Sequence, residues 1–289
     1  MAWRQRTGST VCPGCGSLVG VNDETCYNCG RRNPALWGFS PLLRRLGQDL
    51  GLTNFVTVGC VGLYLATLVA SSNPFGGAGL MSFLAPDGPA ILMFGASGAV
   101  PVFELGRWWT VLSASWLHGS LLHILFNMYA LRQIGPAAAD MYGPGRTVII
   151  YVASGAVGFL LSSAAGHYMT WMPIPFLRGA GWTLGASASL MGLLVAILYY
   201  GHRSGSSLVR GEALRFAVIW LLFGVFLPGV DNYAHVGGLA GGYLLARWLD
   251  PLTRERVDHM IAALVCLLAT ALSIGWSLIS GIELLRQLR

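Results

Sequence analysis

Charged residues are scarce in this chain of 289 residues. Asp, Glu, Lys and Arg make up 10% of it, whereas apolar residues make up 54%. Soluble domains carry about 25% charged residues, and so little charge cannot cover a surface that faces water on all sides. The composition excludes an ordinary soluble globular protein and indicates a chain surrounded by lipid.

Lysine is absent, because all 18 basic residues are arginine. This absence excludes a mechanism that uses an amine as general base or as a Schiff-base former, and with it a Ser–Lys catalytic dyad. The His-Glu-x-x-His pattern of metalloproteases is missing as well. Paired membrane aspartates with a Gly-x-Gly-Asp motif are also missing.

Long uncharged runs occupy most of the chain instead. A helix needs roughly 20 apolar residues to cross a bilayer, with about 17–25 tolerated. On this basis the sequence predicts an all-α polytopic membrane protein with seven crossings. They are expected near residues 54–71, 117–135, 147–166, 184–200, 214–230, 232–249 and 259–282.

The arginines are distributed unequally between the two predicted sides. With a cytoplasmic N-terminus, fourteen lie inside and four lie outside, namely Arg107, Arg178, Arg286 and Arg289. Cytoplasmic loops carry such an excess, so we expect a multi-pass protein of the cell membrane with its N-terminus in the cytoplasm.

Cysteines and turn residues from position 12 argue against a signal peptide. The net charge of +6 then reflects topology and lipid contact, with no basic domain for nucleic acid.

The N-terminal residues 1–33 form a polar head, which an arginine-bearing amphipathic linker, 34–53, joins to the membrane region. Two Cys-x-x-Cys pairs stand in the head: Cys12, Cys15, Cys26 and Cys29. Four thiolates at this spacing satisfy tetrahedral Zn²⁺, and the head looks like a zinc ribbon with a structural metal. Two disulfides are the alternative, but a cytoplasmic location keeps thiols reduced. Cys60 and Cys266 lie mid-membrane and are expected in the core.

A segment rich in glycine and proline, 72–106, joins the first two crossings. Its length exceeds that of a passive connector in a compact protein. It carries many apolar residues without a helical run long enough to span a bilayer. We therefore expect a loop that lies partly in the outer leaflet rather than a disordered solvent loop.

Strongly polar side chains recur at membrane depth, where they are costly and usually functional. The second crossing contains His118, His123 and Asn127, the fourth opens with Ser187, and the sixth opens with His235. These three crossings run from outside to inside, so their polar groups are expected at similar depth. Hydrogen bonding between helices is one alternative. A three-histidine metal site is another, although the spacing of five between the first two histidines does not place them on one helix face.

Glycines in the sixth crossing favour close helix packing. Gly237, Gly238, Gly241 and Gly242 give two overlapping Gly-x-x-x-Gly patterns. Small faces let helix backbones approach each other. Such an approach would bring His235 within hydrogen-bond reach of Ser187.

Together these motifs resemble the rhomboid family of intramembrane serine proteases. The resemblance rests on Trp109, His118-x4-His123-x3-Asn127, Gly-Ala-Ser187 and Gly-Val-Asp-Asn-Tyr-Ala-His235-Val-Gly-Gly-Leu-Ala-Gly. It covers residues 54–250 and implies a six-helix catalytic core. Residues 251–289 add one C-terminal transmembrane helix to that core.

The resemblance implies a role for each of these polar residues. Ser187 would attack the scissile carbonyl and His235 would act as its base. His123, Asn127 and the backbone N–H of Ser187 would hold the oxyanion, with His118 nearby. No cofactor is implied for catalysis, and the implied substrates are single-span transmembrane proteins. The alternative is a catalytically inactive rhomboid-like protein that binds membrane helices; such proteins usually lack the serine or the histidine, and this chain has both.

Two positions depart from the family pattern. Ala188 follows the nucleophile where glycine is usual, and its methyl group could crowd the oxyanion pocket. Thr110 follows Trp109 where arginine is usual, while Arg107 stands two residues before it. How the loop is anchored is therefore open. Asp231 is expected to cap the helix of His235 rather than to orient the imidazole.

Overall fold

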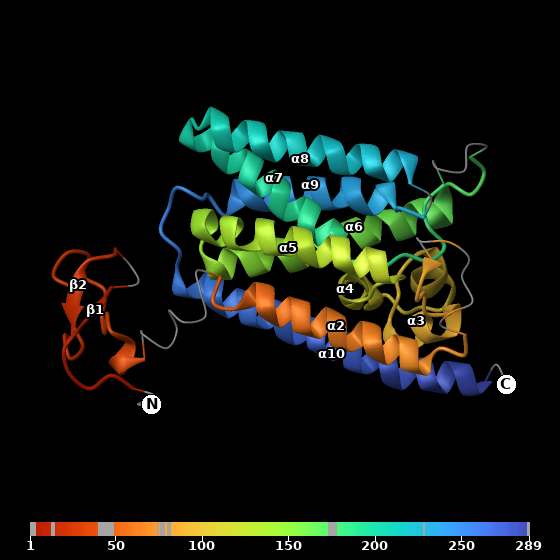
Figure 1. The fold of residues 1–289 in the computed structure, drawn as a ribbon, viewed down its shortest axis with the longest axis horizontal. Coiled ribbons are helices and arrows are strands. Elements are labelled where there is room, and N and C mark those ends of the chain that lie inside the picture. The colour runs from red at the N-terminus through yellow and green to blue at the C-terminus, as the bar shows by residue number, and fades with distance from the viewer. Residues whose placement is uncertain are drawn as a thin grey trace. The chain divides into compact units, whose positions relative to one another are not determined.

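A computed structural model describes residues 4–12, 15–39, 49–73, 75, 79, 82–172, 178–227 and 229–287. The chain divides into two compact units, Met1–Gly51 and Leu52–Arg289. Residues 40–48 of the predicted linker lie outside the described part, and so does the terminal Arg289. Figure 1 shows the two units along the chain.

The first unit is a small hairpin with two cysteine turns. Strand β1 (Ser9–Val11) pairs antiparallel with β2 (Leu18–Gly20), with Thr10 opposite Val19. A short 3-10 turn, η1 (Leu36–Gly38), follows. The hairpin closes at the first cysteine pair, so the two strands position those side chains.

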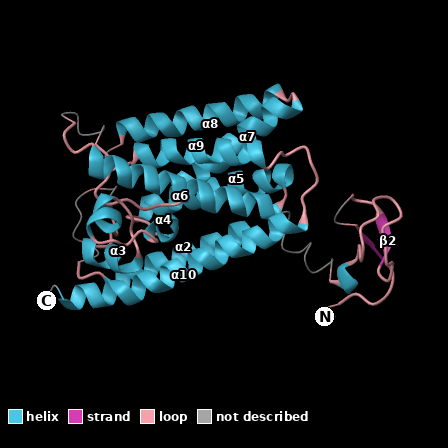
Figure 2. Cartoon of the chain, turned by 180° about the vertical axis from the view of Figure 1, so that it is seen from behind, coloured by secondary structure: helices cyan, strands magenta, loops and turns pink. Residues whose placement is uncertain are grey.

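In the described part of the second unit there are seven long helices, one at each predicted crossing; Figures 1 and 2 show their arrangement. They are α2 (Leu52–Ala70), α5 (Leu121–Tyr142), α6 (Pro144–Tyr168), α7 (Ser187–Ser204), α8 (Ser207–Phe226), α9 (Asn232–Trp248) and α10 (Val257–Gln287). The predicted all-α bundle with one additional C-terminal helix and a small head is confirmed.

Among the described residues, three helices are long and apolar enough to cross a membrane by their own length and composition: α2, α6 and α10. The other four carry the polar, glycine-rich or charged segments of the chain. For example, α9 has 17 residues and includes four glycines. The bundle therefore combines these three helices with four whose length and composition alone do not mark them as membrane spans.

The loop segment after α2 contains short helices, none of spanning length among its described residues. They are α3 (Gly88–Phe94), the π-type turn η3 (Val100–Glu104), α4 (Thr110–Ser113) and the 3-10 turn η4 (Ala114–Trp116). Asp87 caps α3 by accepting a hydrogen bond from the N–H of Ala90, 2.9 Å away, and Gly95 ends it at φ 101°. Residues 82–116 thus form a series of brief helical turns.

The start of α5 differs from the prediction. The helix begins at Leu121, capped by Ser120, whose hydroxyl accepts a hydrogen bond from the N–H of His123 at 3.3 Å. His118 therefore precedes the helix instead of lying on it. The physical reason is the preference of serine for the N-cap position, which starts the helix three residues after His118.

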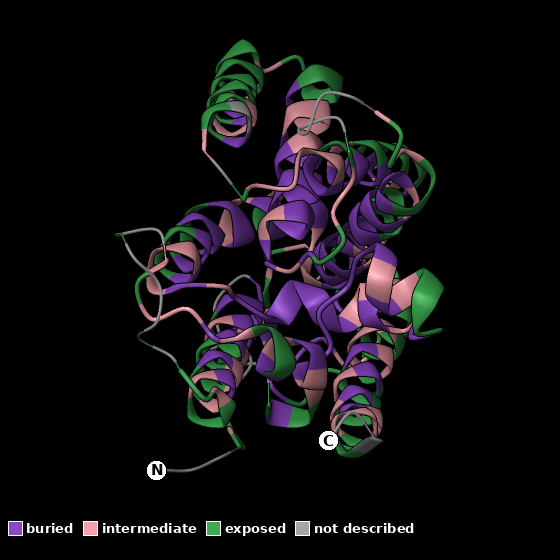
Figure 3. Cartoon of the chain, turned by 90° about the vertical axis from the view of Figure 1, so that its right-hand side faces the viewer, coloured by how far each residue is buried: buried purple, intermediate pink, exposed green. Residues whose placement is uncertain are grey.

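Helix α6 occupies the centre of the bundle and packs on α7, α9 and α10. Viewed from the side at right angles to Figure 1, the buried segments gather toward the middle of the bundle and the exposed ones lie at its edges (Figure 3). The outer helices expose large apolar side chains, such as Phe223 on α8 and Leu272 on α10. Apolar residues that face outward, with polar side chains kept in the interior, are the arrangement expected of a protein in lipid.

Candidate active site

Ser187 and His235 lie within hydrogen-bond distance of each other. Ser187 is the first residue of α7, and His235 is in the first turn of α9. The Oγ of Ser187 is 2.9 Å from the Nε2 of His235. Two residues 48 positions apart in the chain are thus brought together from the starts of different helices.

The surroundings of His235 leave the serine as its polar partner. Its Nδ1 is buried and has no hydrogen-bond partner among the described residues. Asp231 caps α9 through the N–H of Ala234 at 3.0 Å and accepts a hydrogen bond from the hydroxyl of Ser162 at 2.5 Å. Its expected role as a helix cap is confirmed, and its oxygens are engaged away from the imidazole.

Glycines bring α9 into backbone contact with its neighbours. A Cβ built on Gly238 would lie 2.2 Å from the carbonyl oxygen of Ala188, and one on Gly242 would lie 2.4 Å from that of Gly192. On the other side, a Cβ on Gly237 would lie 2.8 Å from the Cα of Gly158 in α6. No side chain fits at these positions, so the predicted close approach is confirmed. This approach sets the Ser187–His235 distance.

His123 lies against the loop that precedes Ser187. A Cβ built on Gly185 would be 2.6 Å from its Nε2, and Gly185 itself has φ 128°, a conformation suited to glycine. The N–H of Gly119 donates to its Nδ1 at 3.3 Å. In a neutral ring this bond assigns the proton to Nε2, which makes the atom beside Gly185 a hydrogen-bond donor.

Asn127 and His118 complete the polar group near this loop. The Asn127 amide nitrogen donates to the carbonyl of His123 at 2.8 Å, and its buried Oδ1 has no partner among the described residues. The ring of His118 meets that of His123 edge to face, with centroids 5.1 Å apart. His123 thus contacts both residues, His118 through its ring and Asn127 through its backbone carbonyl, and His118 makes this contact from outside the helix.

The methyl group of Ala188 does not project freely. It is fully buried in a small apolar cluster with Ala114, Phe159 and Ala234, and Gly158 leaves room for it. The departure from the usual glycine is therefore accommodated by α6 and α9. Ser189 is also fully buried; its hydroxyl faces Gly155 of α6, away from the imidazole.

The backbone around Ser187 has supports that sequence reasoning missed. The N–H of Gly185 donates to the carbonyl of Ala114 at 2.9 Å. Thr183 and Ser97 exchange backbone hydrogen bonds of 2.8 and 2.9 Å in an antiparallel bridge. The segment before Ser187 is therefore held by the loop between α2 and α5. No local pattern in either segment indicates this pairing.

Residues 105–251 match the family described as the rhomboid domain, which is about half of the chain. The chain belongs to the rhomboid family. Ser187, His235 and the polar cluster of His118, His123 and Asn127 lie inside the matched range. Rhomboid membership together with the apolar helices makes this a membrane-embedded protein.

Individual rhomboid relatives support the same assignment. The chain is 31% identical to the rhomboid protease GluP of Bacillus subtilis over 169 residues, which are 57% of this chain and 31% of GluP. It is 33% identical to RHOMBOID-like protein 4 of Arabidopsis thaliana over 165 residues, 55% of this chain and 39% of that protein. The matches thus span about a third of the length of these two relatives. Their names include both a protease and a rhomboid-like protein.

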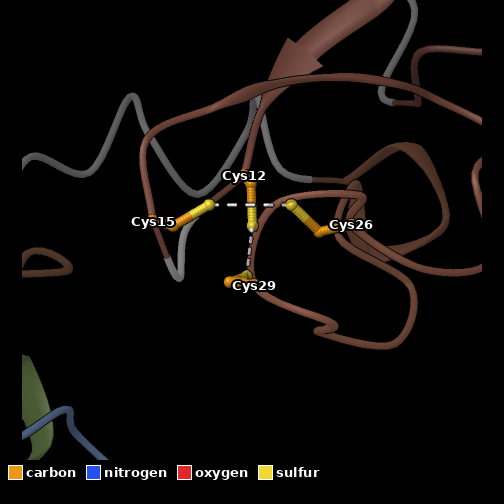
Figure 4. Close-up of side chains that lie close together, drawn as sticks. All are labelled: Cys12, Cys15, Cys26 and Cys29. Carbon is orange, nitrogen blue, oxygen red and sulfur yellow. Dashed lines mark hydrogen bonds between the residues drawn. The ribbon is translucent and has the colours of Figure 1, made fainter.

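A separate cluster in the first unit lies outside the rhomboid match. The Sγ atoms of Cys12, Cys15, Cys26 and Cys29 all lie within 4.8 Å of one another (Figure 4). Two of the separations are 3.7 Å (Cys12–Cys29) and 3.6 Å (Cys15–Cys26). A tetrahedral zinc ion with bonds of about 2.3 Å requires sulfur atoms about 3.8 Å apart. The four sulfurs therefore fit a metal ion of this kind.

The turns that carry these cysteines have matching geometry. The N–H of Gly16 donates to the carbonyl of Cys12, and that of Gly30 to the carbonyl of Cys26, each at 2.9 Å. Both glycines have positive φ, 77° and 70°, a conformation that glycine adopts without steric cost. Hydrogen bonds with the side chain and backbone of Ser17 lower the pKa of Cys15 to about 6, whereas burial and hydrogen bonds with the other three thiols raise the pKa of Cys29 to about 11.

Proposed function

We propose that this rhomboid protein is an intramembrane serine endopeptidase that cleaves single-span transmembrane proteins. The observation that carries the proposal is the 2.9 Å separation between the Oγ of Ser187 and the Nε2 of His235. A serine hydroxyl is a weak nucleophile until a neighbouring base takes its proton. An imidazole at hydrogen-bond distance is the group that most often does so.

The proposed reaction has two halves. Ser187 Oγ attacks the scissile carbonyl while its proton passes to Nε2 of His235, and the carbonyl oxygen becomes an oxyanion. When the intermediate collapses, the C–N bond breaks and the imidazolium gives the proton to the leaving amine. A water molecule, deprotonated by the same imidazole, then hydrolyses the acyl-enzyme and restores the serine hydroxyl.

Oxyanion stabilisation is assigned to three donors near the nucleophile: the backbone N–H of Ser187, the Nε2–H of His123 and the amide of Asn127. The position of Ser187 at the start of α7 adds the partial positive charge of a helix N-terminus. The contact of His123 with Gly185 supports its assignment, and the amide of Asn127 has a second N–H beyond the one given to His123. His118 packs on the His123 ring and would fix its orientation.

No acid is assigned to a catalytic triad. Both oxygens of Asp231 have partners in the cap of α9 and in Ser162. A dyad of serine and histidine with a neutral imidazole agrees with that arrangement. The arginine bias of the loops supports an orientation in which α5, α7 and α9 start toward the outside, so cleavage is proposed near the outer face of the membrane.

The test is labelling of purified full-length protein in detergent micelles with a fluorophosphonate, together with cleavage of a generic single-span substrate. We expect wild type to label and to cleave, and Ser187→Ala to do neither. His235→Ala should retain its fold and lose turnover. An unlabelled wild type, or equal labelling of Ser187→Ala, would instead identify an inactive rhomboid-like protein that binds membrane helices.

A further inference from the structure

The C-terminal helix α10 makes polar contacts with the segment around α4. Two serines one helical turn apart, Ser273 and Ser277, are buried on the face of α10 that meets Trp109. The hydroxyl of Ser273 donates to the carbonyl of Trp109 at 2.7 Å, and the indole N–H of Trp109 donates to the hydroxyl of Ser277 at 3.1 Å. A helix that only filled space against lipid would have no need for such bonds.

Arg107 joins α10 to α3. Its side chain is buried, with 3% of the residue exposed. One guanidinium nitrogen donates to the carbonyl of Leu92 in α3 at 2.7 Å, and another donates to the carbonyl of Ser277 in α10 at 2.8 Å. The planar fork of arginine can bridge two such acceptors, whereas a lysine ammonium has no fixed fork. Arg107 thus anchors the loop, although it does not follow Trp109 as the family pattern would have it.

Two short series of hydrogen bonds connect the anchored segment to the loop before Ser187. Ser113 of α4 donates to the carbonyl of Gly95 at 2.8 Å, which fixes the end of α3. Two residues later, Ser97 forms the backbone bridge to Thr183, four residues before the nucleophile. On the opposite side, the carbonyl of Ala114 holds the N–H of Gly185. Ser97 and Ala114, which hold the loop before Ser187, therefore both belong to the segment that contacts α10. The C-terminal end of α10 lies beside α3 and α4 at the same end of the bundle in Figures 1 and 2.

We propose that α10 is a positioning element of the active site, acting through Arg107 and Ser277 on the loop that carries Ser187. This inference rests on the proposed protease function. The helix outside the six-helix core would then set the rate of the chemical step, without touching substrate. Misplacement of reacting groups by about 1 Å can cost about a hundredfold in rate, so a small shift of this support is measurable.

A matched pair of glycines on α10 tests the proposal. A Cβ on Gly281 would lie 2.6 Å from the Cα of Met93 in α3, whereas a Cβ on Gly275 would meet nothing within 4 Å. Both substitutions to alanine remove a helix glycine from the same helix, but only Gly281→Ala pushes α10 away from the loop. We expect kcat to fall about tenfold or more in Gly281→Ala, with KM within about twofold, and Gly275→Ala to match wild type.

Arginine variants provide a second test with its own control. Arg107→Gln should lower kcat in the same way, Arg107→Lys should recover part of the loss, and Arg286→Gln, an exposed site on the same end of α10, should match wild type. In Gly281→Ala and Arg107→Gln the extent of fluorophosphonate labelling at Ser187 should be complete while its rate falls, whereas the control variants should label at the wild-type rate. Complete extent with a slower rate distinguishes positioning from partial unfolding, which lowers the extent.

The outcomes separate this inference from the proposed function. A wild type that neither labels nor cleaves overturns the protease assignment. Active wild type with kcat unchanged in both Gly281→Ala and Arg107→Gln overturns the positioning role of α10 alone. A loss that appears only as reduced extent of labelling, at an unchanged rate, also overturns it, because α10 would then act on stability only.

Discussion

The backbone of Gly238 in α9 lies directly against the carbonyl of Ala188, the residue after Ser187. A Cβ on Gly238 would come within 2.2 Å of that oxygen, so the distance between the two helices is set by the absence of a side chain. Because Ser187 and His235 sit at the starts of these helices, the same contact determines whether the hydroxyl and the imidazole meet.

Gly238→Ala is therefore expected to separate Ser187 from His235 and to abolish cleavage. The added methyl group meets backbone rather than a flexible side chain, so the helices must move apart. Gly62→Ala is the control, because a Cβ at that position of α2 meets nothing within 4 Å. Cleavage of a single-span substrate by the two variants checks the prediction, and wild-type turnover in Gly238→Ala would contradict the role assigned to this contact.

Asp231→Ala should lower stability while leaving turnover largely in place. The carboxylate caps α9 and bonds to Ser162, and loss of an N-cap costs about 0.5–2 kcal/mol. If Asp231 oriented the imidazole, Asp231→Ala would instead lower kcat strongly, whatever its effect on stability. Thermal unfolding in micelles, measured beside kcat, separates the two roles.

Asp231→Asn is the matched control for that experiment, because asparagine caps helices as well as aspartate does. It should retain most of the stability and the activity of wild type. A drop in kcat of a hundredfold or so in both variants would mean that the charge of Asp231 acts on His235, against the arrangement of hydrogen bonds described here.

His123→Ala should lower kcat by about 10²–10³, the usual effect of removing one oxyanion donor. The reason is the Nε2–H that lies beside Gly185. The rate of fluorophosphonate labelling should fall with it, since phosphonylation also develops charge on oxygen. Tyr129→Ala, at an exposed position on the same helix, is the control. Equal kcat in the two variants would remove His123 from the proposed oxyanion site.

The positions of the helices and of the polar residues could be predicted because each has a signal in the sequence itself, either a long uncharged run or a polar residue within such a run. The uncharged runs located seven helices, and the glycines of α9 indicated its close packing. The start of α5 was misplaced although Ser120 is a helix-start signal three residues before His123. The cap of α3 had a signal as well, in Asp87 followed by Gly-Pro.

Other features had no signal that could be read from the chain. Arg107 contacts a carbonyl 170 residues away, and a backbone acceptor leaves no mark on the sequence. Arg146 in α6 is a similar case: it is buried and donates to the carbonyls of Leu249, Asp250 and Thr253 in the linker before α10. The arginine bias of the loops places Arg107 among the outside charges and Arg146 among the inside charges, and it indicates neither contact.

Arg146→Met should destabilise the protein by at least about 2 kcal/mol, because each buried acceptor left without a partner costs about 1–3 kcal/mol. Arg203→Met is the control: Arg203 forms an exposed ion pair with Asp250 at 3.6 Å, and such pairs contribute about 0–1 kcal/mol. Thermal unfolding in micelles measures both. Similar small losses would show that the linker carbonyls find other partners when the guanidinium is removed.

The cysteine cluster predicts that the head carries one zinc ion per chain and that the membrane unit does not depend on it. The four sulfurs have the separations of a tetrahedral site, and they belong to a different compact unit from Ser187. Cys12→Ser should lose the metal, measured by elemental analysis of the purified full-length protein, and should still label at Ser187. Cys60→Ser, a buried position in α2, should keep both the metal and the labelling at Ser187.

After chelation, thiol titration should reveal four newly reactive cysteines, since thiolates released from a metal react whereas disulfides do not. No gain in reactive thiols, together with no metal, would replace the zinc assignment with two disulfides.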